Sequence, residues 1–184
     1  MGHRLTREDV VDAAVRAAVS GGLSSLSFRT VAAEAGTSDR MVVYYLPDKA
    51  TLLTAVLTHV GERLRGVLAA SLPEDAGRGL RPHDVLRASR PVFTDPANGP
   101  VLRLFLEAVG LGAARVAPFD VVVPQLLAGW VAWLEPHMGP TAAPGSAAAT
   151  VATVDGLLIV SALLGEDAGR AAWDAVLDGA TTRR

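Results

Sequence analysis

The 184-residue chain has no cysteine, a single lysine and only 5% aromatic residues. Without thiols it can form neither a disulfide nor a thiolate metal site. Its first residues, MGHRLTRED, lack the apolar core of a signal peptide, so we expect a cytoplasmic protein. Sixteen arginines beside that one lysine, with abundant alanine, valine and glycine, indicate the codon bias of a GC-rich genome more than a binding strategy.

Motifs for catalysis are also lacking. The four histidines are far apart, with no i, i+4 pair among them: His3, His59, His83 and His137. The sequence therefore shows no zinc site and no base–nucleophile pair. It has no Gly-rich phosphate loop either, since residues 76–78 read as an ordinary loop. We predict no enzymatic activity, no metal and no cofactor.

A short segment, residues 26–53, contains two helix starts with a glycine turn between them. Ser27 is a good N-cap, and the residues after it form an apolar face at helical spacing: Val31, Ala32 and Ala35. Gly36 ends this helix, because glycine tolerates the left-handed conformation, and Thr37-Ser38 offer a new N-cap. The pattern predicts a helix-turn-helix, a motif that binds DNA.

The second helix of the motif is predicted over residues 39–45. Leu46-Pro47 ends it, and Asp48 caps a third helix that begins with Lys49. Hydroxyls and cations along this stretch can bind phosphate oxygens and base edges. We predict that Arg40 reads bases and that Met41 touches a thymine methyl group. The predicted phosphate contacts are Ser27, Arg29, Thr37, Ser38, Tyr44, Tyr45 and Lys49.

The segment resembles the N-terminal DNA-binding domain of the TetR family of transcriptional repressors. That pattern runs roughly A-x-x-A-G-V-S-x-x-x-L-Y-x-H-F-x-S-K-x-x-L. The matching positions are Ala32, Ala35, Gly36, Ser38, Val42, Lys49 and Leu52 or Leu53. Three positions depart: Val43 replaces tyrosine, Tyr45 histidine and Leu46 phenylalanine. A phosphate contact from these positions does not carry over unchanged, and Tyr44 or Tyr45 is the candidate to replace it. The match covers about the first third of the chain.

The net charge of the predicted DNA-binding domain contributes little to DNA affinity. The chain has a formal net charge of −2, and residues 1–49 carry six basic and six acidic side chains, a local net charge of zero. Phosphate neutralisation supplies most non-specific DNA affinity. However, Arg29, Arg40 and Lys49 gather around the second helix of the motif. We expect weak non-specific binding, with affinity depending on a few placed groups.

Helical periodicity continues along the whole chain, and no strand pattern occurs. Thr6 caps a first helix, whose apolar stripe ends at Gly21-Gly22: Val10, Val11, Ala14, Val15, Ala17 and Ala18. A long helix follows over residues 48–71, with the stripe Leu53, Val56, Leu57, Val60, Leu64, Val67 and Leu68. Before the first helix, His3 and Arg4 are either an arm that reaches DNA or a frayed terminus.

After a predicted loop at 72–82, further helices are expected at 83–93, 98–113, 119–135, 146–164 and 167–181. Pro124 either kinks its helix or marks the true start. The prediction is an all-α fold of about nine helices, matching what the resemblance implies. It has a helix-turn-helix head at residues 1–48 and a helical regulatory, ligand-binding and dimerisation domain at 49–184.

Residues 147–164 are almost uniformly apolar over a length near the membrane-spanning minimum. Asp155 argues against insertion, because a carboxylate at the bilayer centre costs about 2.5–3.5 kcal/mol. We expect a helix buried partly by its own chain and partly by a second copy. The last helix adds a stripe of small residues, Ala168, Ala172, Ala175 and Gly179, flanked by Trp173, Val176 and Leu177.

We therefore predict a homodimer through the two C-terminal helices. In the resembling family these pair as a four-helix bundle across a two-fold axis. Two recognition helices then meet successive major grooves of a palindrome, about 34–36 Å apart.

A ligand pocket needs apolar walls with a few polar groups, and the resemblance implies one between the fourth and eighth helices. Bulky candidates are Phe93, Phe105, Phe119, Trp130 and Trp133, for which core packing is the alternative; polar candidates are Arg103, Glu107, His137 and Asp155. The predicted ligand-binding set is Phe93, Arg103, Phe105, Glu107, Trp130, Trp133 and Asp155. A lone carboxylate within an apolar helix must face a partner, a cavity or an interface, so Asp155 lines either the pocket or the dimer seam.

The resemblance implies a homodimeric repressor of operator DNA. A small apolar or amphipathic effector would release it by changing the tilt of the fourth helix. The neutral head and the departures at Val43 and Leu46 motivate an alternative, a helical small-molecule binding or interaction protein whose head does not bind DNA.

Overall fold

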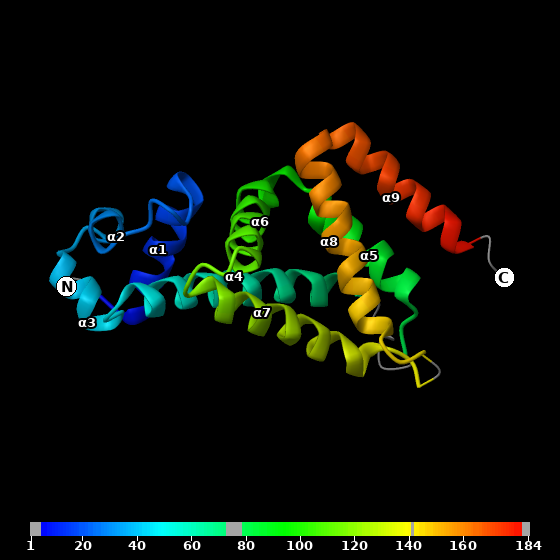
Figure 1. Cartoon of the computed structure of the whole chain (residues 1–184), viewed down its shortest axis with the longest axis horizontal. Coiled ribbons are helices and arrows are strands. Elements are labelled where there is room, and N and C mark those ends of the chain that lie inside the picture. The colour runs from blue at the N-terminus through cyan, green and yellow to red at the C-terminus, as the bar shows by residue number, and fades with distance from the viewer. Residues whose placement is uncertain (1–4, 73–78, 141, 182–184) are drawn as a thin grey trace. The chain divides into compact units, whose positions relative to one another are not determined.

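A computed structural model describes residues 5–72, 79–140 and 142–181 of the chain. These residues form nine α-helices and two short 3₁₀ helices (Figure 1). The described part has no β-strand, only an isolated parallel bridge between Leu80 and Met138. The prediction of an all-α fold with about nine helices is confirmed.

The α-helices are α1 (Arg7–Gly21), α2 (Phe28–Ala35), α3 (Asp39–Tyr45), α4 (Lys49–Ser71), α5 (Pro82–Thr94), α6 (Gly99–Ala113), α7 (Phe119–Leu134), α8 (Ser146–Leu164) and α9 (Glu166–Thr181). The 3₁₀ helices are η2 (Pro96–Asn98) and η3 (Glu135–His137). Helix α7 begins at Phe119, so Pro124 lies inside it and does not mark its start. His3, Arg4 and residues 73–78 of the predicted loop lie outside the described residues.

The apolar stripe predicted for helix α4 is buried at six of its seven positions: Leu53, Val56, Leu57, Val60, Leu64 and Leu68. The prediction was wrong for Val67, whose side chain is 41% exposed. Leu64 and Leu68 are one helical turn apart and already occupy the inward direction. Val67 is rotated by about 100° from Leu68 and therefore points away from that line.

The chain divides into two compact units. The first comprises Met1–Arg63 and Arg103–Leu126, and the second comprises Leu64–Leu102 and Leu127–Arg184. The predicted head lies within the first unit, together with most of α6 and the first half of α7. The domain boundary after residue 48 stays a prediction.

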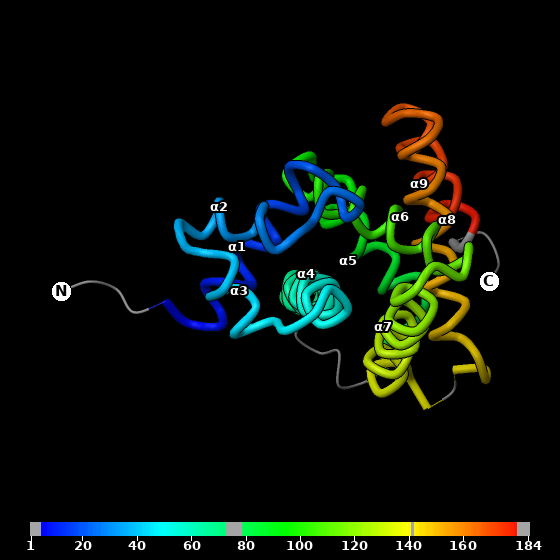
Figure 2. The backbone as a smooth tube through the Cα atoms, turned by 60° about the vertical axis from the view of Figure 1, so that its left-hand side comes forward, coloured from blue at the N-terminus to red at the C-terminus, as the bar shows by residue number. Residues whose placement is uncertain are grey.

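Local capping fixes where the first helices begin. At the start of α1, the Thr6 hydroxyl accepts from the Asp9 amide (3.2 Å), and the Asp9 carboxylate accepts from the Thr6 amide (2.7 Å). Helices α1, α2 and α3 then pack together in one group (Figure 2). Their contacts bury a continuous set of apolar side chains, including Val10, Ala13, Ala14, Val31 and Val42. This core holds the helix-turn-helix in place.

In the second unit, helices α5, α8 and α9 pack against one another, and α8 and α9 form a tight hairpin (Figure 1). The close approach requires Gly169, since a Cβ on this residue would lie 3.0 Å from the Ser161 Cα. Trp173 on α9 is completely buried. Gly169 is thus the small residue that lets α8 and α9 approach each other closely. It lies next to Ala168, the first residue of the predicted stripe of small residues.

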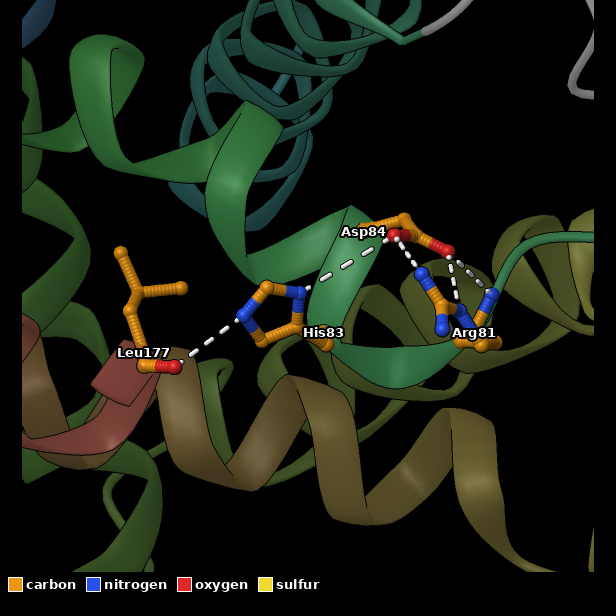
Figure 3. A network of polar contacts seen from close by, with 4 residues as sticks. All are labelled: Arg81, His83, Asp84 and Leu177. Atoms are coloured by element: carbon orange, nitrogen blue, oxygen red, sulfur yellow. Dashed lines mark hydrogen bonds and ion pairs between the residues drawn. The ribbon is translucent and has the colours of Figure 1, made fainter. Parts of the chain in front are cut away.

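A polar network fixes the first turn of α5 to the end of α9 (Figure 3). The Arg81 guanidinium binds the Asp84 carboxylate through two contacts of 3.0 Å, which lowers the pKa of Asp84. The Nε2 atom of His83 lies 3.1 Å from the Leu177 carbonyl oxygen. A carbonyl can only accept, so this His83 nitrogen carries a proton. The network therefore positions α9 relative to α5.

Helix α8 is long and apolar enough to span a membrane, with a mean hydropathy of 2.0. Only 28% of its apolar window is buried within the described part of the chain. Its buried side chains are Ala147, Thr150, Val154, Leu157 and Leu158. Length and composition alone are weak support for a membrane span, and this helix packs against α5 and α9 along one face.

Candidate functional site

The turn between α2 and α3 has the geometry that the sequence predicts. Ser27 caps α2, with its hydroxyl accepting from the Thr30 amide (3.2 Å). Gly36 ends the helix in the left-handed conformation (φ 63°, ψ 36°), which favours glycine. The Thr37 amide then donates to the Ala32 carbonyl (2.9 Å), which closes the turn. Helix α3 begins two residues later, so the predicted helix-turn-helix is confirmed.

Burial fixes which side of α3 faces outward. Val42 and Leu46 are completely buried, one turn apart on the inner side. At about 100° per residue, Arg40 and Tyr44 then lie on the opposite side. Arg40 is exposed, and the Tyr44 side chain is 76% exposed. The short helix therefore presents a cation and a phenol to solvent.

The other predicted DNA contacts differ in how free their polar groups are. Arg29, Ser38 and Lys49 are exposed, and the Ser38 hydroxyl makes no capping bond to α3. Tyr45 is half-buried, and its hydroxyl donates to the Leu5 carbonyl oxygen (2.7 Å). Its proton is therefore already donated to Leu5, two residues before α1 begins. Sequence periodicity gives no signal for this contact, which joins residues 40 positions apart.

Some cations of the first unit form ion pairs with carboxylates, and others do not. Arg16 on α1 pairs with Glu34 on α2 (2.8 Å). In contrast, Arg29, Arg40 and Lys49 have no ion pair within the described residues. These three cations remain available to an anionic partner, although the net charge of residues 1–49 is zero.

Two carboxylates of the first unit have structural contacts of their own. The Asp48 carboxylate accepts from the Thr51 amide (2.7 Å), so it caps α4 as predicted, and this bond lowers its pKa. Asp12 lies 3.4 Å from the Nε2 atom of His59. An open groove of about 760 Å³ lies beside them, between α1 and α4, and none of the predicted ligand residues lines it.

Glu107, a predicted ligand residue, binds the loop between α1 and α2. Its two carboxylate oxygens accept from the Leu23 amide (3.0 Å) and the Ser24 amide (3.1 Å). Leu23 itself is 1% exposed. Glu107 thus joins α6 to the turn that precedes the helix-turn-helix. The sequence could not reveal this bond, because the partners are more than 80 residues apart.

The two tryptophan candidates of the second unit lie together on α7. The rings of Trp130 and Trp133 meet edge to face with centroids 5.8 Å apart. Trp133 also lies 4.9 Å from the His137 ring, and the Arg65 guanidinium lies 5.9 Å from the Trp130 ring. Trp133 packs beside a buried cluster that includes Leu134. Both tryptophans are only half-buried, so their rings retain surface for further contacts.

Asp155 lies in the middle of α8 and is half-buried. Its carboxylate has no hydrogen bond or ion pair with the described residues. Burial raises the pKa of Asp155 to about 6. An unpaired carboxylate on an apolar helix is an unusual group that a binding partner would stabilise.

The seven predicted ligand residues do not all belong to one unit. Arg103, Phe105 and Glu107 lie in the first unit, and Phe93, Trp130, Trp133 and Asp155 lie in the second. Arg103 is exposed, whereas Phe93 and Phe105 are half-buried. Phe119, an aromatic candidate outside that set, is buried, which fits the alternative of core packing. The ligand assignment of the seven residues stays a prediction.

Comparison with known proteins gives a consistent result. The family model for bacterial regulatory proteins of the tetR family matches residues 10–56. The HTH-type transcriptional repressor DrrR1 of Streptomyces coeruleorubidus is 46% identical over 56 residues, which are 30% of this chain. The matched segment spans only 21% of the length of that curated relative.

The likeness extends over the whole fold. The multidrug binding protein EbrR, solved with imidazole, superposes with a TM-score of 0.73 at 25% identity, covering 96% of this chain and 94% of EbrR. A TetR-family member from Streptomyces coelicolor A3 gives a TM-score of 0.66 at 26% identity, covering 94% and 95%. Residues 10–56 therefore match the tetR family of bacterial regulatory proteins, and the fold of the chain is similar to that of solved TetR-family regulators.

The structure explains two of the three departures from the TetR-family pattern. Leu46, in place of phenylalanine, is completely buried, so an apolar side chain fills that core position. Tyr45, in place of histidine, bonds the Leu5 carbonyl. Val43, in place of tyrosine, is 39% exposed on α3 and has no polar group.

Replacing Glu107 should loosen the loop between α1 and α2. We expect Glu107→Ala to lower the free energy of unfolding by about 1–2 kcal/mol, because two backbone donors lose their acceptor. Glu107→Gln keeps one acceptor and should lose about half as much. Hydrogen exchange of the Leu23 and Ser24 amides should accelerate in both variants. The exposed Glu62→Ala is the control; unchanged exchange in Glu107→Ala would contradict the assignment.

Asp155 should make stability depend on pH. Its pKa in the folded protein is about 6, above the value of about 3.9 for an unfolded aspartate, so the folded state holds the proton more strongly. Its contribution to stability is therefore present below pH 4 and lost as pH rises through 6. Urea unfolding from pH 4 to 7.5 should show Asp155→Asn gaining stability over the wild type as pH rises. A difference that stays constant would contradict this.

Proposed function

We propose that this protein is a homodimeric repressor of the TetR family that binds a palindromic operator and is released by a small-molecule effector. The observation that carries the proposal is the outward face of α3, where Arg40 and Tyr44 project from a helix-turn-helix. Such a helix fits the major groove of B-DNA, where an arginine can bind guanine O6 and N7. We assign the protein to the cytoplasm, where operator DNA lies.

The proposed DNA contacts follow from exposure and charge. Arg40 reads a base edge, and the unpaired cations Arg29 and Lys49 bind phosphates on either side. The free Ser38 hydroxyl and the exposed Tyr44 hydroxyl add phosphate contacts, as do Ser27 and Thr37. Tyr45 acts indirectly, by binding the Leu5 carbonyl ahead of α1.

The proposed dimer uses helices α8 and α9. Helix α8 leaves large apolar side chains exposed near its end: Ile159, Leu163 and Leu164. Small residues precede them on exposed positions, with open space around Gly156. Large exposed apolar surfaces on soluble proteins mark interaction sites. A second copy of the chain packed against this face would bury the exposed apolar side chains of α8. This is the C-terminal pairing that the family resemblance implies.

The proposed effector is a small, flat, amphipathic aromatic molecule. EbrR has been solved in complex with malachite green and with proflavin. Trp130 and Trp133 offer half-buried ring surfaces, and Asp155 offers an unpaired carboxylate that would favour a cationic ligand. Such a ligand releases DNA only if it binds the DNA-incompetent state more tightly. The hydrogen bonds of Glu107 with the Leu23 and Ser24 amides would transmit a shift of α6 to the head.

Two variants should separate base reading from phosphate binding. We measure binding to the DNA flanking the protein's own gene and to an unrelated duplex, over a range of salt. Arg40→Ala should lose discrimination between the two by about tenfold or more, since a bidentate base contact is worth about 1–3 kcal/mol. Lys49→Ala should weaken both equally and lower the salt slope by about one.

The exposed Arg87→Ala on α5 is the matched control, and its binding should be unchanged. Equal losses on both duplexes for Arg40→Ala and Lys49→Ala would refute this division of roles. If the wild type forms no salt-sensitive complex at all, the alternative of a ligand-binding protein without DNA-binding activity is favoured.

A charge on the exposed face of α8 should dissociate the dimer. Leu163 is 77% exposed in the single chain, so Leu163→Asp costs little in the fold itself but places a charge in the proposed interface. Sedimentation velocity should show a monomer and operator affinity should fall, because two half-sites are no longer linked. Val121→Asp on α7 is the control, being 56% exposed and apolar. A dimeric Leu163→Asp would exclude this interface.

A further inference from the structure

The outward surface of α3 is more apolar than a phosphate-binding surface needs to be. Besides Arg40 and Asp39 at the first position of the helix, its exposed side chains are Met41 (37%), Val43 (39%) and Tyr44 (76%). Since Val42 is buried, Met41 and Val43 are each rotated by about 100° from the inner line, in opposite directions. They therefore flank the outer ridge formed by Arg40 and Tyr44, one on each side.

Val43 can contribute to DNA binding only through its methyl groups. It has no donor or acceptor, so it gains nothing from a phosphate oxygen or a polar base edge. In the major groove the apolar feature of a base pair is the C5-methyl group of thymine. Met41, on the opposite flank, has a flexible apolar side chain that suits the same partner.

The charge of the head gives such contacts more weight. The net charge of residues 1–49 is zero, so phosphate neutralisation contributes less affinity than in a basic domain. The described head has four cations without an ion pair, namely Arg7, Arg29, Arg40 and Lys49. Sequence-dependent contacts at the bases must therefore supply a larger share of operator affinity.

We propose that Met41 and Val43 read thymine methyl groups on the two sides of the guanine that Arg40 contacts. The operator half-site would then carry thymines on both flanks of that guanine. This inference rests on the proposed function, because it requires α3 to enter the major groove. It goes further in assigning Val43, which has no polar group, a role in specificity.

The test begins with selection of operator sequences by the full-length protein from random duplex DNA. Each thymine of the enriched half-site is then replaced by uracil, which keeps base pairing and removes only the methyl group. We expect about a fourfold loss of affinity at each of two positions, the value of one buried methyl group. Replacement of thymines elsewhere in the half-site should have no effect.

Variants assign each thymine to its side chain. In Val43→Ala, one of the two uracil effects should disappear; in Met41→Ala, the other should disappear. Both residues are exposed, so these variants should keep the fold. Val67→Ala, an exposed valine on α4, is the matched control and should retain both effects.

The outcomes separate this inference from the proposed function. If no sequence is enriched, the DNA-binding function itself fails. If a half-site is enriched but uracil has no effect, the protein binds operator DNA and the methyl-reading inference is overturned. Uracil effects that persist unchanged in both Val43→Ala and Met41→Ala also overturn it.

Discussion

The complete burial of Val42 and Leu46 sets the rotation of helix α3, and the proposed recognition surface depends on it. A helix of seven residues has too few internal hydrogen bonds to be stable alone. Tertiary packing at these two positions therefore supplies most of its order. Any rotation of α3 would move Arg40 and Tyr44 away from the outer surface, so the apolar core and the polar surface of this helix are set by the same contacts.

Two further contacts hold the head around this helix. The left-handed Gly36 sets the direction in which α3 leaves α2. At the other end of α2, the Glu107 carboxylate holds the preceding loop through the Leu23 and Ser24 amides. The second contact comes from α6, more than 80 residues further along the chain. The head is therefore held by the local turn at Gly36 and by the carboxylate of Glu107, which is distant in sequence.

Contacts between near neighbours could be predicted from the sequence. Thr6, Ser27 and Asp48 each cap a helix through a residue three positions ahead, so propensity and spacing were sufficient. The turn at Gly36 followed from the same chemistry. The helices beyond residue 80 also matched closely, because proline and glycine mark their ends.

Contacts between distant residues could not be predicted in this way. Glu107 was predicted to be a polar group of a ligand pocket, yet both of its carboxylate oxygens accept from backbone amides of the loop between α1 and α2. The Tyr45 hydroxyl bonds a carbonyl at the start of the chain. In both cases residue type gave the hydrogen-bonding capacity, but only the tertiary fold decides which partner uses it. Val67 is an apolar example: helical periodicity predicted a buried side chain, but the side chain is exposed.

The position of Lys49 has a consequence for covalent chemistry. It is the sole lysine among 184 residues, and it is exposed at the first position of α4, directly after the Asp48 cap. Reagents specific for side-chain amines therefore have one target in the chain, beside the helix-turn-helix. A fluorophore or cross-linker attached there would report on the head without any engineered residue. Acetylation of this amine would remove one of the unpaired cations in the described head.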